Sequence, residues 1–310
     1  MLRRHFNLAV CSIALAPHAV LASNKRGPMF WFATRGKARV FLMAIADAKA
    51  DDESWFTPAI RQAFNDSSEL WMEVAPPDAS AGLDAETKAK ADAEYQKLRH
   101  EPTGRTFFDE LEPAVRQRVL TYMEELKIKK ETLEPLRPWA AFYAINGAYW
   151  SRTKVNYEPV YIDQLLWKQA ADSGKTIGYE MSAGVAFAQF MAAMPQKAQS
   201  QYIEFLLSSF DDRKKGLGGD AFDWQVGSPN GSLRSFDRMR KQTPDLYKIM
   251  QVQRNTWWAH KIDALLNTDK NHFIAMGHMH VLGPDGIPNQ LQRLHIVKPA
   301  EFHENPSYPS

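Results

Sequence analysis

Two histidines stand near the C-terminal end of the sequence, where an apolar run gives way to a turn. His278 and His280 follow the apolar residues 273–276 and a glycine, and the turn sequence Gly-Pro-Asp-Gly occupies residues 283–286. In α/β proteins, residues that do chemistry gather at the carboxyl ends of strands, because the loops that follow are free to be polar and variable in shape. Two imidazoles at such a position suggest a metal site or an acid–base site.

Carboxylates end or interrupt three other apolar runs, and they are the candidate partners of these histidines. Asp47 follows FLMAIA, Glu73 lies within LWMEV, and Glu180 follows TIGY. In a mostly parallel sheet these strand ends share one edge, where carboxylate oxygens and imidazole nitrogens can bind a divalent ion such as Mn, Co or Zn. A metal-bound water has a lowered pKa and is a nucleophile near neutral pH. The sequence therefore predicts Asp47, Glu73, His280 and His278 as metal ligands.

Each of these residues also has a structural interpretation, which the sequence leaves open. Asp47 can cap a turn, Glu180 can cap a helix, and a single histidine is more often structural than functional. Glu73 differs, because an unpaired carboxylate within an apolar strand is costly and requires a partner or a function. If the strand continues through residues 278–280, the side chains of both histidines point to the same face.

The first 22 residues have the features of a secretory signal peptide. Two arginines precede an apolar segment at residues 8–16, and small residues favour cleavage after Ala22. We therefore expect a periplasmic or secreted protein whose mature chain is a single domain over residues 23–310. The one cysteine, Cys11, lies in the signal peptide, so the mature chain can have neither disulfides nor thiolate ligands.

The charge balance gives no indication of a nucleic acid or a membrane surface as a partner. The sequence has 38 basic and 36 acidic residues, and the signal peptide holds two arginines and no acidic residue, so the mature chain is neutral. A neutral chain gives no support for binding to nucleic acid or to a membrane surface through net charge. No second apolar run is long enough for a transmembrane helix, so no integral membrane segment is expected after cleavage.

The pattern of apolar residues predicts an α/β fold with a mixed, mostly parallel central sheet flanked by helices. Apolar runs predict strands at residues 38–48, 69–77, 176–179, 273–276 and 293–301. Thr57 and Pro58 indicate the start of a helix between the first two strands. The right-handed βαβ rule then places those two strands side by side and parallel.

Charged residues alternating with apolar ones at helical spacing occupy residues 84–150, which we interpret as a helical insertion. The charge runs in this segment indicate solvated helix faces rather than a binding patch. Further helices are expected at residues 246–267 and 287–294.

The order of several motifs resembles the TraB/PrgY/GumN family, which includes the Tiki proteases. The motifs cover most of the mature chain and read PMFWFATRGKARVFLMAIAD, WFTPAIRQAFNDSSELWMEV, LRPWAA, YIDQLLWKQAADSGKTIGYE, GLGGDAFDW, RNTWWAHKIDALL and GHMHVLGPDG. The last is the most specific, since it contains a Gly-x-x-His motif. The resemblance implies the α/β fold shared with erythromycin esterase and the haem-associated ChaN proteins. For Tiki-like members it implies metal-dependent peptide hydrolysis.

The resemblance also implies which residues form the site. His280 matches the histidine of the second Gly-x-x-His motif, and Glu73 matches the glutamate of the family. Glu180, Arg254 and Asn255 fall on family positions near the site. We therefore expect Glu73, His280, Glu180 and Arg254 as catalytic residues.

The first Gly-x-x-His motif of the family is changed in this chain. It aligns with residues 44–47, Ala-Ile-Ala-Asp, so the glycine is lost and Asp47 replaces the histidine. Aspartate can ligate a divalent ion, but it is shorter, charged and harder than imidazole. The change either shifts metal preference toward Mn-like or Mg-like ions or abolishes catalysis. His278 is the candidate for the missing imidazole.

Two functions therefore remain open. The first is a secreted or periplasmic metal-dependent hydrolase that acts on peptides, and the second is a non-catalytic protein that binds a peptide or small molecule. Haem binding is a minor variant of the second, because His-Met-His offers axial ligands. The chain does not fit an amidohydrolase, whose His-x-His lies on an early strand. It does not fit a serine hydrolase of the Gly-x-Ser-x-Gly type, because that turn does not occur.

Overall fold

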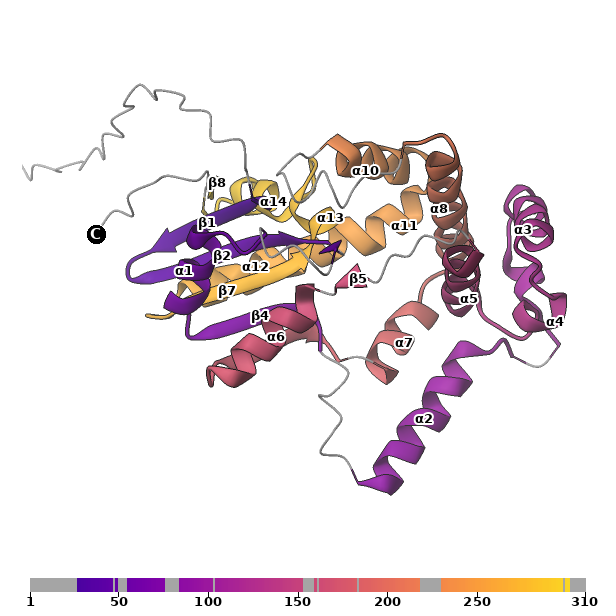
Figure 1. Ribbon diagram of the computed structural model, residues 1–310, viewed down its shortest axis with the longest axis horizontal. Helices are drawn as coiled ribbons and strands as arrows, with labels where there is room; N and C mark the ends of the chain where they lie inside the picture. Colours follow the sequence, from indigo (N-terminus) through magenta and orange to yellow (C-terminus); the bar gives the residue numbers. More distant parts are fainter. Residues whose placement is uncertain are drawn as a thin grey trace, which may run out of the picture.

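The described strands form one six-stranded sheet and a separate pair of short strands. The structure is a computed structural model, which describes residues 27–46, 48–49, 55–75, 84–102, 104–152, 159–160, 162–182, 184–217, 230–297 and 299–301. Across the sheet the order is β6-β4-β7-β2-β1-β8, and Figure 1 labels the strands of this order from β4 to β8. These strands are β1 (Phe30–Arg35), β2 (Ala38–Ile45), β4 (Glu69–Val74), β6 (Thr176–Met181), β7 (Asn271–Gly277) and β8 (Ala300–Glu301). The short pair is β3 (Ala48–Lys49) with β5 (Pro159–Val160).

The sheet is parallel at its centre and antiparallel on one side. β2, β7, β4 and β6 run parallel to one another, whereas β1 is antiparallel to both β2 and β8. In β2 and β7 the apolar residues follow one another in a continuous run, which is typical of strands that are covered on both faces. This architecture confirms the predicted mixed, mostly parallel α/β fold.

β7 lies between β2 and β4, so the expected side-by-side pairing of the first two parallel strands is wrong. β2 pairs with β7 from Arg39 opposite Asn271 to Ile45 opposite Gly277, and β4 pairs with the other side of β7. Residues 273–276 of β7 are fully buried. The centre of the sheet suits this strand, because burial there removes its apolar side chains from water.

Helix α1 (Pro58–Asp66) begins where the sequence predicts it. Pro58 occupies its first turn, and the hydroxyl of Thr57 accepts a hydrogen bond of 3.3 Å from the backbone N–H of Ile60. The helix packs Phe64 edge-on against Phe273 of β7, with ring centroids 5.4 Å apart. The same core also receives α6 (Ile162–Asp172) and α14 (Ile287–Arg293). We call this sheet with its covering helices the sheet lobe.

A second hydrophobic core is formed by helices, and we call it the helical lobe. It comprises α2 (Ala85–Arg99), η3 (Phe107–Glu110), α3 (Pro113–Leu126), α4 (Lys130–Leu133), α5 (Pro138–Arg152), α7 (Val185–Ala192), α8 (Gln196–Lys214) and α10 (Asn230–Gln242). Trp139, Phe107 and Phe210 lie at its centre, fully buried. Figure 1 shows α2, α3 and α4 set apart from the sheet. The predicted insertion at residues 84–150 is therefore only part of this lobe, because α7, α8 and α10 share its core.

One long helical run joins the two lobes. It consists of α11 (Pro244–Tyr247), η4 (Lys248–Gln253), which is π-helical, and α12 (Arg254–Leu266). Leu246 and Tyr247 belong to the core of the helical lobe, and Trp258 and Ile262 belong to the core of the sheet lobe. The predicted helix at residues 246–267 is confirmed, apart from the π-helical segment within it. Among the described residues, no helix combines the length and apolar character needed to cross a membrane.

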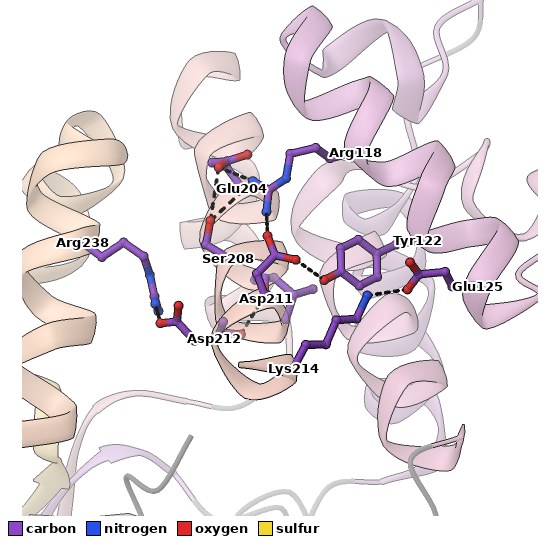
Figure 2. A network of polar contacts seen from close by, with 11 residues as sticks. Arg118, Tyr122, Glu125, Glu204, Ser208, Asp211, Asp212, Lys214 and Arg238 are labelled. Carbon is purple, nitrogen blue, oxygen red and sulfur yellow. Dashed lines mark hydrogen bonds and ion pairs between the residues drawn. The ribbon is translucent and has the colours of Figure 1, made fainter. Parts of the chain in front are cut away.

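Ion pairs hold α3 against α8 at the surface of the helical lobe (Figure 2). Arg118 pairs with Glu204 and, at 2.6 Å, with Asp211. The hydroxyl of Tyr122 donates to the same aspartate at 2.5 Å. The side chain of Arg118 is 30% exposed. Water therefore screens this network, which we interpret as a structural link between the two helices.

The predicted strand at residues 293–301 is wrong except for its last two residues, which form β8. Helix α14 instead ends in a left-handed turn with His295 at a φ of 55°. The N–H groups of His295 and Ile296 donate to the carbonyls of Gln292 and Leu291, at 3.1 and 3.0 Å. This is the hydrogen-bonding pattern of a Schellman motif, in which glycine usually occupies the left-handed position. The missing glycine explains why the sequence pattern does not reveal the turn.

Candidate functional site

The carboxyl ends of β4, β6 and β7 meet at one edge of the sheet. Glu73 lies near the end of β4, Glu180 near the end of β6, and His280 in the helical turn α13 (His278–Val281), directly after β7. Because the three strands run parallel, these ends lie side by side. Three polar residues that are distant in the sequence are thereby brought to one place.

Glu73 and His280 form a close pair, in which the imidazole is buried and the carboxylate is partly exposed. Oε1 of Glu73 lies 3.0 Å from Nε2 of His280, and Oε2 accepts a hydrogen bond of 2.9 Å from the backbone N–H of Gly277. The side chain of His280 is 5% exposed and that of Glu73 is 24% exposed. A Cβ atom at position 277 would stand 3.0 Å from Oε2 of Glu73. The glycine of the Gly-x-x-His motif therefore allows the end of β7 to approach and bind the carboxylate.

Arg254 connects Glu73 with Glu180. Its Nη2 atom donates to Oε1 of Glu73 at 2.8 Å, while Nε and Nη2 donate to the two oxygens of Glu180 at 2.8 and 2.6 Å. The indole N–H of Trp258 adds a bond of 2.8 Å to Glu180. Arg254 is 7% exposed, and charges at this depth are tolerated where they are paired and hydrogen-bonded. We call Glu73, Glu180, Arg254 and His280 the charge cluster.

Asn255 fixes the orientation of the His280 imidazole. Its Nδ2 donates to the backbone carbonyl of Asp285 at 2.7 Å, and its Oδ1 lies 2.6 Å from Nδ1 of His280. Because the Asp285 carbonyl can only accept, the amide oxygen of Asn255 must face the imidazole, so Nδ1 of His280 carries a proton. Nε2 is then the nitrogen that remains for a proton or a cation beside Glu73. Metal-binding histidines are commonly oriented in this way.

The charge cluster holds Glu73 in its ionised form. Burial raises the pKa of Glu73, but His280, Arg254 and the N–H of Gly277 outweigh burial and hold it well below its usual range. Burial likewise lowers the pKa of Arg254, and the bonds to Glu180 and Glu73 more than reverse this effect. The cluster therefore sets the ionised carboxylate of Glu73, and beside it the carboxylate of Glu180, against one guanidinium.

A π-helical segment places the two polar residues that organise the cluster. η4 ends directly before Arg254 and Asn255, which begin α12. Arg254 binds Glu180, and its neighbour Asn255 binds His280. Short π-helical segments within helices are rare and occur frequently at functional sites. Its position directly before these two residues agrees with a functional role for the cluster.

Four of the predicted site residues lie together, namely those of the charge cluster. Their catalytic roles stay predictions. Asp47 lies outside the described residues. His278 lies in the helical turn α13, so the strand does not continue through His278 and His280, and the condition for their side chains to share a face is not met. Residues two positions apart on a helix are separated by about 200° around its axis.

The described residues offer an incomplete set of metal ligands. Within the described part of the chain, no group of three or more His, Cys, Asp or Glu side chains is arranged to hold a metal ion. Glu73 and His280 supply two donor atoms 3.0 Å apart, whereas catalytic zinc sites have three protein ligands. The pair fits a divalent cation if one further ligand is added, and Asp47 is the predicted one. Ile45, two residues before it, pairs with Gly277 at this edge of the sheet.

Sequence reasoning missed the residues that support the cluster from outside it. Trp258 binds Glu180, and the hydroxyl of Tyr247 donates to Asp285 at 2.6 Å. An aromatic residue in an amphipathic helix predicts packing, and nothing in the sequence indicates where its polar atom will bind. Asp285 belongs to the Gly-Pro-Asp-Gly sequence, whose composition indicates a turn and no further role.

The residues of the cluster fall within a family match. A sequence profile described as the TraB/PrgY/gumN family matches residues 29–297. The chain belongs to the TraB/PrgY/gumN family. The matched range contains all the residues of the charge cluster and most of the described fold, which confirms the expected membership. Comparisons with curated proteins and with solved structures give no significant match.

Proposed function

We propose that this TraB/PrgY/gumN-family protein is a metal-dependent hydrolase that cleaves peptide bonds at the charge cluster. The observation that carries the proposal is the Glu73–His280 pair, with Nε2 of the imidazole 3.0 Å from the carboxylate and Nδ1 held by Asn255. An ionised carboxylate beside a buried, oriented imidazole, at the carboxyl ends of parallel strands, is typical of a catalytic site.

The composition of the cluster suits a divalent cation such as Mn, Co or Zn. A carboxylate oxygen of Glu73 and Nε2 of His280 are ligand types that these ions accept, and Asp47 is the proposed third ligand. Two carboxylates against one guanidinium leave an excess of negative charge when His280 is neutral, and Asp47 increases it. When bound, the cation supplies a water that is activated near neutral pH.

The residues of the chain have separate tasks in this proposal. His280 keeps its proton on Nδ1, against Asn255, and thereby presents the lone pair of Nε2. Glu73 is ionised at neutral pH and so can bind a cation or accept a proton from water. Arg254 holds Glu73 and Glu180 in fixed positions, which keeps the charges preorganised.

Non-catalytic binding of a peptide or small molecule is the second candidate function, and one observation favours it. Nη2 of Arg254 donates to the same Oε1 atom of Glu73 that faces His280. The guanidinium therefore already satisfies the oxygen that a cation would use. If Asp47 is too poor a ligand, the cluster is a closed ion-pair network beneath a binding site.

Cleavage of unfolded casein by the mature protein tests the proposed activity. We expect cleavage that EDTA stops and that Mn, Co or Zn restores. His280→Ala should abolish it, whereas His260→Ala, at an exposed position of α12, should leave it unchanged. Cleavage that persists in EDTA or in His280→Ala would contradict the proposal.

Restoring the first family motif separates the two candidate functions. The variant with Ala44→Gly and Asp47→His recovers the Gly-x-x-His sequence. Activity that appears only in this variant supports non-catalytic binding by the natural chain. Activity in the natural chain supports the hydrolase.

We also propose that residues 1–22 direct export to the periplasm or out of the cell. The support is the sequence pattern of a charged start, an apolar segment and small residues at the cleavage position. N-terminal sequencing of the exported protein is expected to begin at Ser23. Full-length protein confined to the cytoplasm would contradict the proposal.

A further inference from the structure

β6 is the strand of the sheet edge nearest the charge cluster, and it is more exposed than the strands inside the sheet. Among the described strands it stands at the end of the order, with β4 as its neighbour. Tyr179 of β6 is 42% exposed, whereas Leu70 and Met72 of β4 are buried. In the part of the chain that the structure describes, β6 is therefore open along one side.

The hydrogen bonds of β6 show which of its backbone groups face the open side. The N–H of Thr176 donates to the carbonyl of Ser68, just before β4, at 3.3 Å. In a parallel strand the N–H and C=O of one residue face the same neighbour, and successive residues alternate. Thr176 and Gly178 therefore turn toward β4, and Ile177 and Tyr179 turn outward. The alternation ends at Glu180, which is missing from the register with β4, and the carbonyl of Met181 accepts a bond of 3.0 Å from the N–H of Ala75. Among the described residues, β4 is the strand that pairs with β6, so these outward groups have no strand partner there.

From Thr176 to Tyr179 this edge lacks the features that usually prevent pairing with another strand, because its register with β4 runs without a gap there and is interrupted at Glu180. Exposed edges are commonly protected by lysine, proline, a bulge or a charge that points inward from the strand. The sequence of β6, TIGYEM, has one charged residue, Glu180, and its carboxylate is bound by Arg254. Lys175, just before the strand, turns back to the carbonyl of Ser67. An edge of this kind suits the addition of an extended peptide.

We propose that β6 binds the substrate peptide as an added strand, through the outward N–H and C=O groups of Ile177 and Tyr179. The inference rests on the proposed function and names how the substrate is held. Only an extended backbone offers donors and acceptors alternating at the spacing of a strand, so the ligand is a polypeptide segment. Glu180 follows Tyr179 directly, and its partner Arg254 binds Glu73. A peptide that runs along β6 to its carboxyl end therefore arrives at the charge cluster.

The spacing of strands shows which part of the peptide can be cleaved. An added strand lies about 4.8 Å from β6 and about 10 Å from β4, which carries Glu73. The segment paired with β6 is therefore an anchor. The bond to be cut lies farther along, where the peptide crosses the carboxyl ends of β6 and β4. Because backbone contacts read no sequence, this anchor favours any unfolded segment over folded proteins and very short peptides.

Proline at position 179 tests the anchor. Proline is accepted in an edge strand where the N–H faces outward, so Tyr179→Pro should retain the fold while it removes one donor and obstructs pairing. With fluorescein-labelled unfolded casein, we expect fluorescence polarisation to show binding weakened about tenfold or more. Tyr179→Ala keeps the N–H and is the matched control for loss of the side chain, so it should bind more tightly than Tyr179→Pro. Thermal unfolding of both variants checks that the fold is retained.

Hydrogen exchange provides a second readout that does not depend on cleavage. In EDTA, casein is expected to slow amide exchange at Ile177 and Tyr179. Binding with this protection but without any hydrolase activity overturns the proposed function and leaves the anchor supported. Cleavage without this protection overturns the anchor and leaves the proposed function supported.

Three further outcomes overturn the anchor itself. They are the absence of casein binding, equal binding by Tyr179→Pro and the natural chain, and protection of these amides that rises with protein concentration alone. The last would assign the edge to a second copy of the chain.

Discussion

Two arginines in this molecule each bind two carboxylates, and the depth of burial distinguishes them. Arg118 links α3 to two acidic residues of α8 in the helical lobe (Figure 2), and Arg254 links Glu73 to Glu180 in the sheet lobe. The side chain of Arg118 is 30% exposed and that of Arg254 is 8% exposed. Water screens the first network, whereas the second network keeps its charges despite a large desolvation penalty. The same pairing is thus a surface link in one lobe and the frame of a candidate site in the other.

Replacing each arginine by methionine tests this comparison with the largest expected effect. Arg254→Met leaves Glu73 and Glu180 without their guanidinium, so we expect the free energy of unfolding to fall by about 3–5 kcal/mol. Arg118→Met acts on a screened network and should lower it by about 1 kcal/mol or less. Urea denaturation of both variants measures the difference. Equal losses would show that burial does not separate the two networks.

Two glycines, one in each lobe, extend the comparison to packing. A Cβ atom at Gly178 of β6 would stand 2.5 Å from the ring of Trp71, over which Lys261 lies at 3.7 Å. Gly178→Ala should therefore destabilise the protein by about 1–3 kcal/mol, because the ring must move.

Gly147 of α5 is the matched control, since a Cβ atom there meets nothing within 4 Å. Gly147→Ala should raise the free energy of unfolding by about 0.5–1 kcal/mol, because alanine favours the helix. Urea denaturation compares the two variants. A gain at both positions would mean that the contact between Gly178 and Trp71 is loose.

The smallest expected effect is on pH dependence, where the two lobes should respond with opposite sign. His272 of β7 is 1% exposed, and burial lowers its pKa from 6.5 despite the attraction of Glu69. Below about pH 6.5, the unfolded chain binds a proton at His272 that the folded chain does not bind. The free energy of unfolding therefore falls as the pH drops below about 6.5. Near α2, burial and the charge of Glu110 raise the pKa of Glu101 from 4.5 to about 7. The folded chain binds the extra proton there, so stability falls as pH rises from 4.5 through 7.

Unfolding free energies between pH 5 and 8 test these signs. Glu101→Gln should remove the decline toward higher pH, and His272→Asn should remove the decline toward lower pH. If each variant keeps the pH dependence of the natural chain, the residue that it replaces is not the titrating group.

Local signals in the sequence predicted much of the sheet lobe. Thr57 and Pro58 mark the start of α1 as expected, and the carboxylate of Glu73, judged too costly to stand alone, is paired with Arg254 and His280. These predictions succeed because capping and the burial of charge act at the residue itself.

The order of the strands and the supports of the site were beyond the sequence pattern. The position of β7 between β2 and β4 depends on pairing between distant segments. The bond between Asn255 and the Asp285 carbonyl depends on where a turn passes over a helix. The sequence does not predict the end of α14, because His295 occupies the left-handed position at which glycine is usual. Each of these features is fixed by tertiary packing, which cannot be predicted from the sequence of one segment alone.

The proposed hydrolase requires Glu73 and His280 to hold a divalent cation. Isothermal titration of the EDTA-treated mature protein with Mn²⁺, Co²⁺ and Zn²⁺ tests it most directly. We expect one ion per chain, affinity reduced about 10- to 100-fold in Asn255→Ala, and binding lost in His280→Ala. Circular dichroism checks that each variant is folded. A folded natural chain that binds none of these ions, or that binds them no better than His280→Ala, would contradict the account.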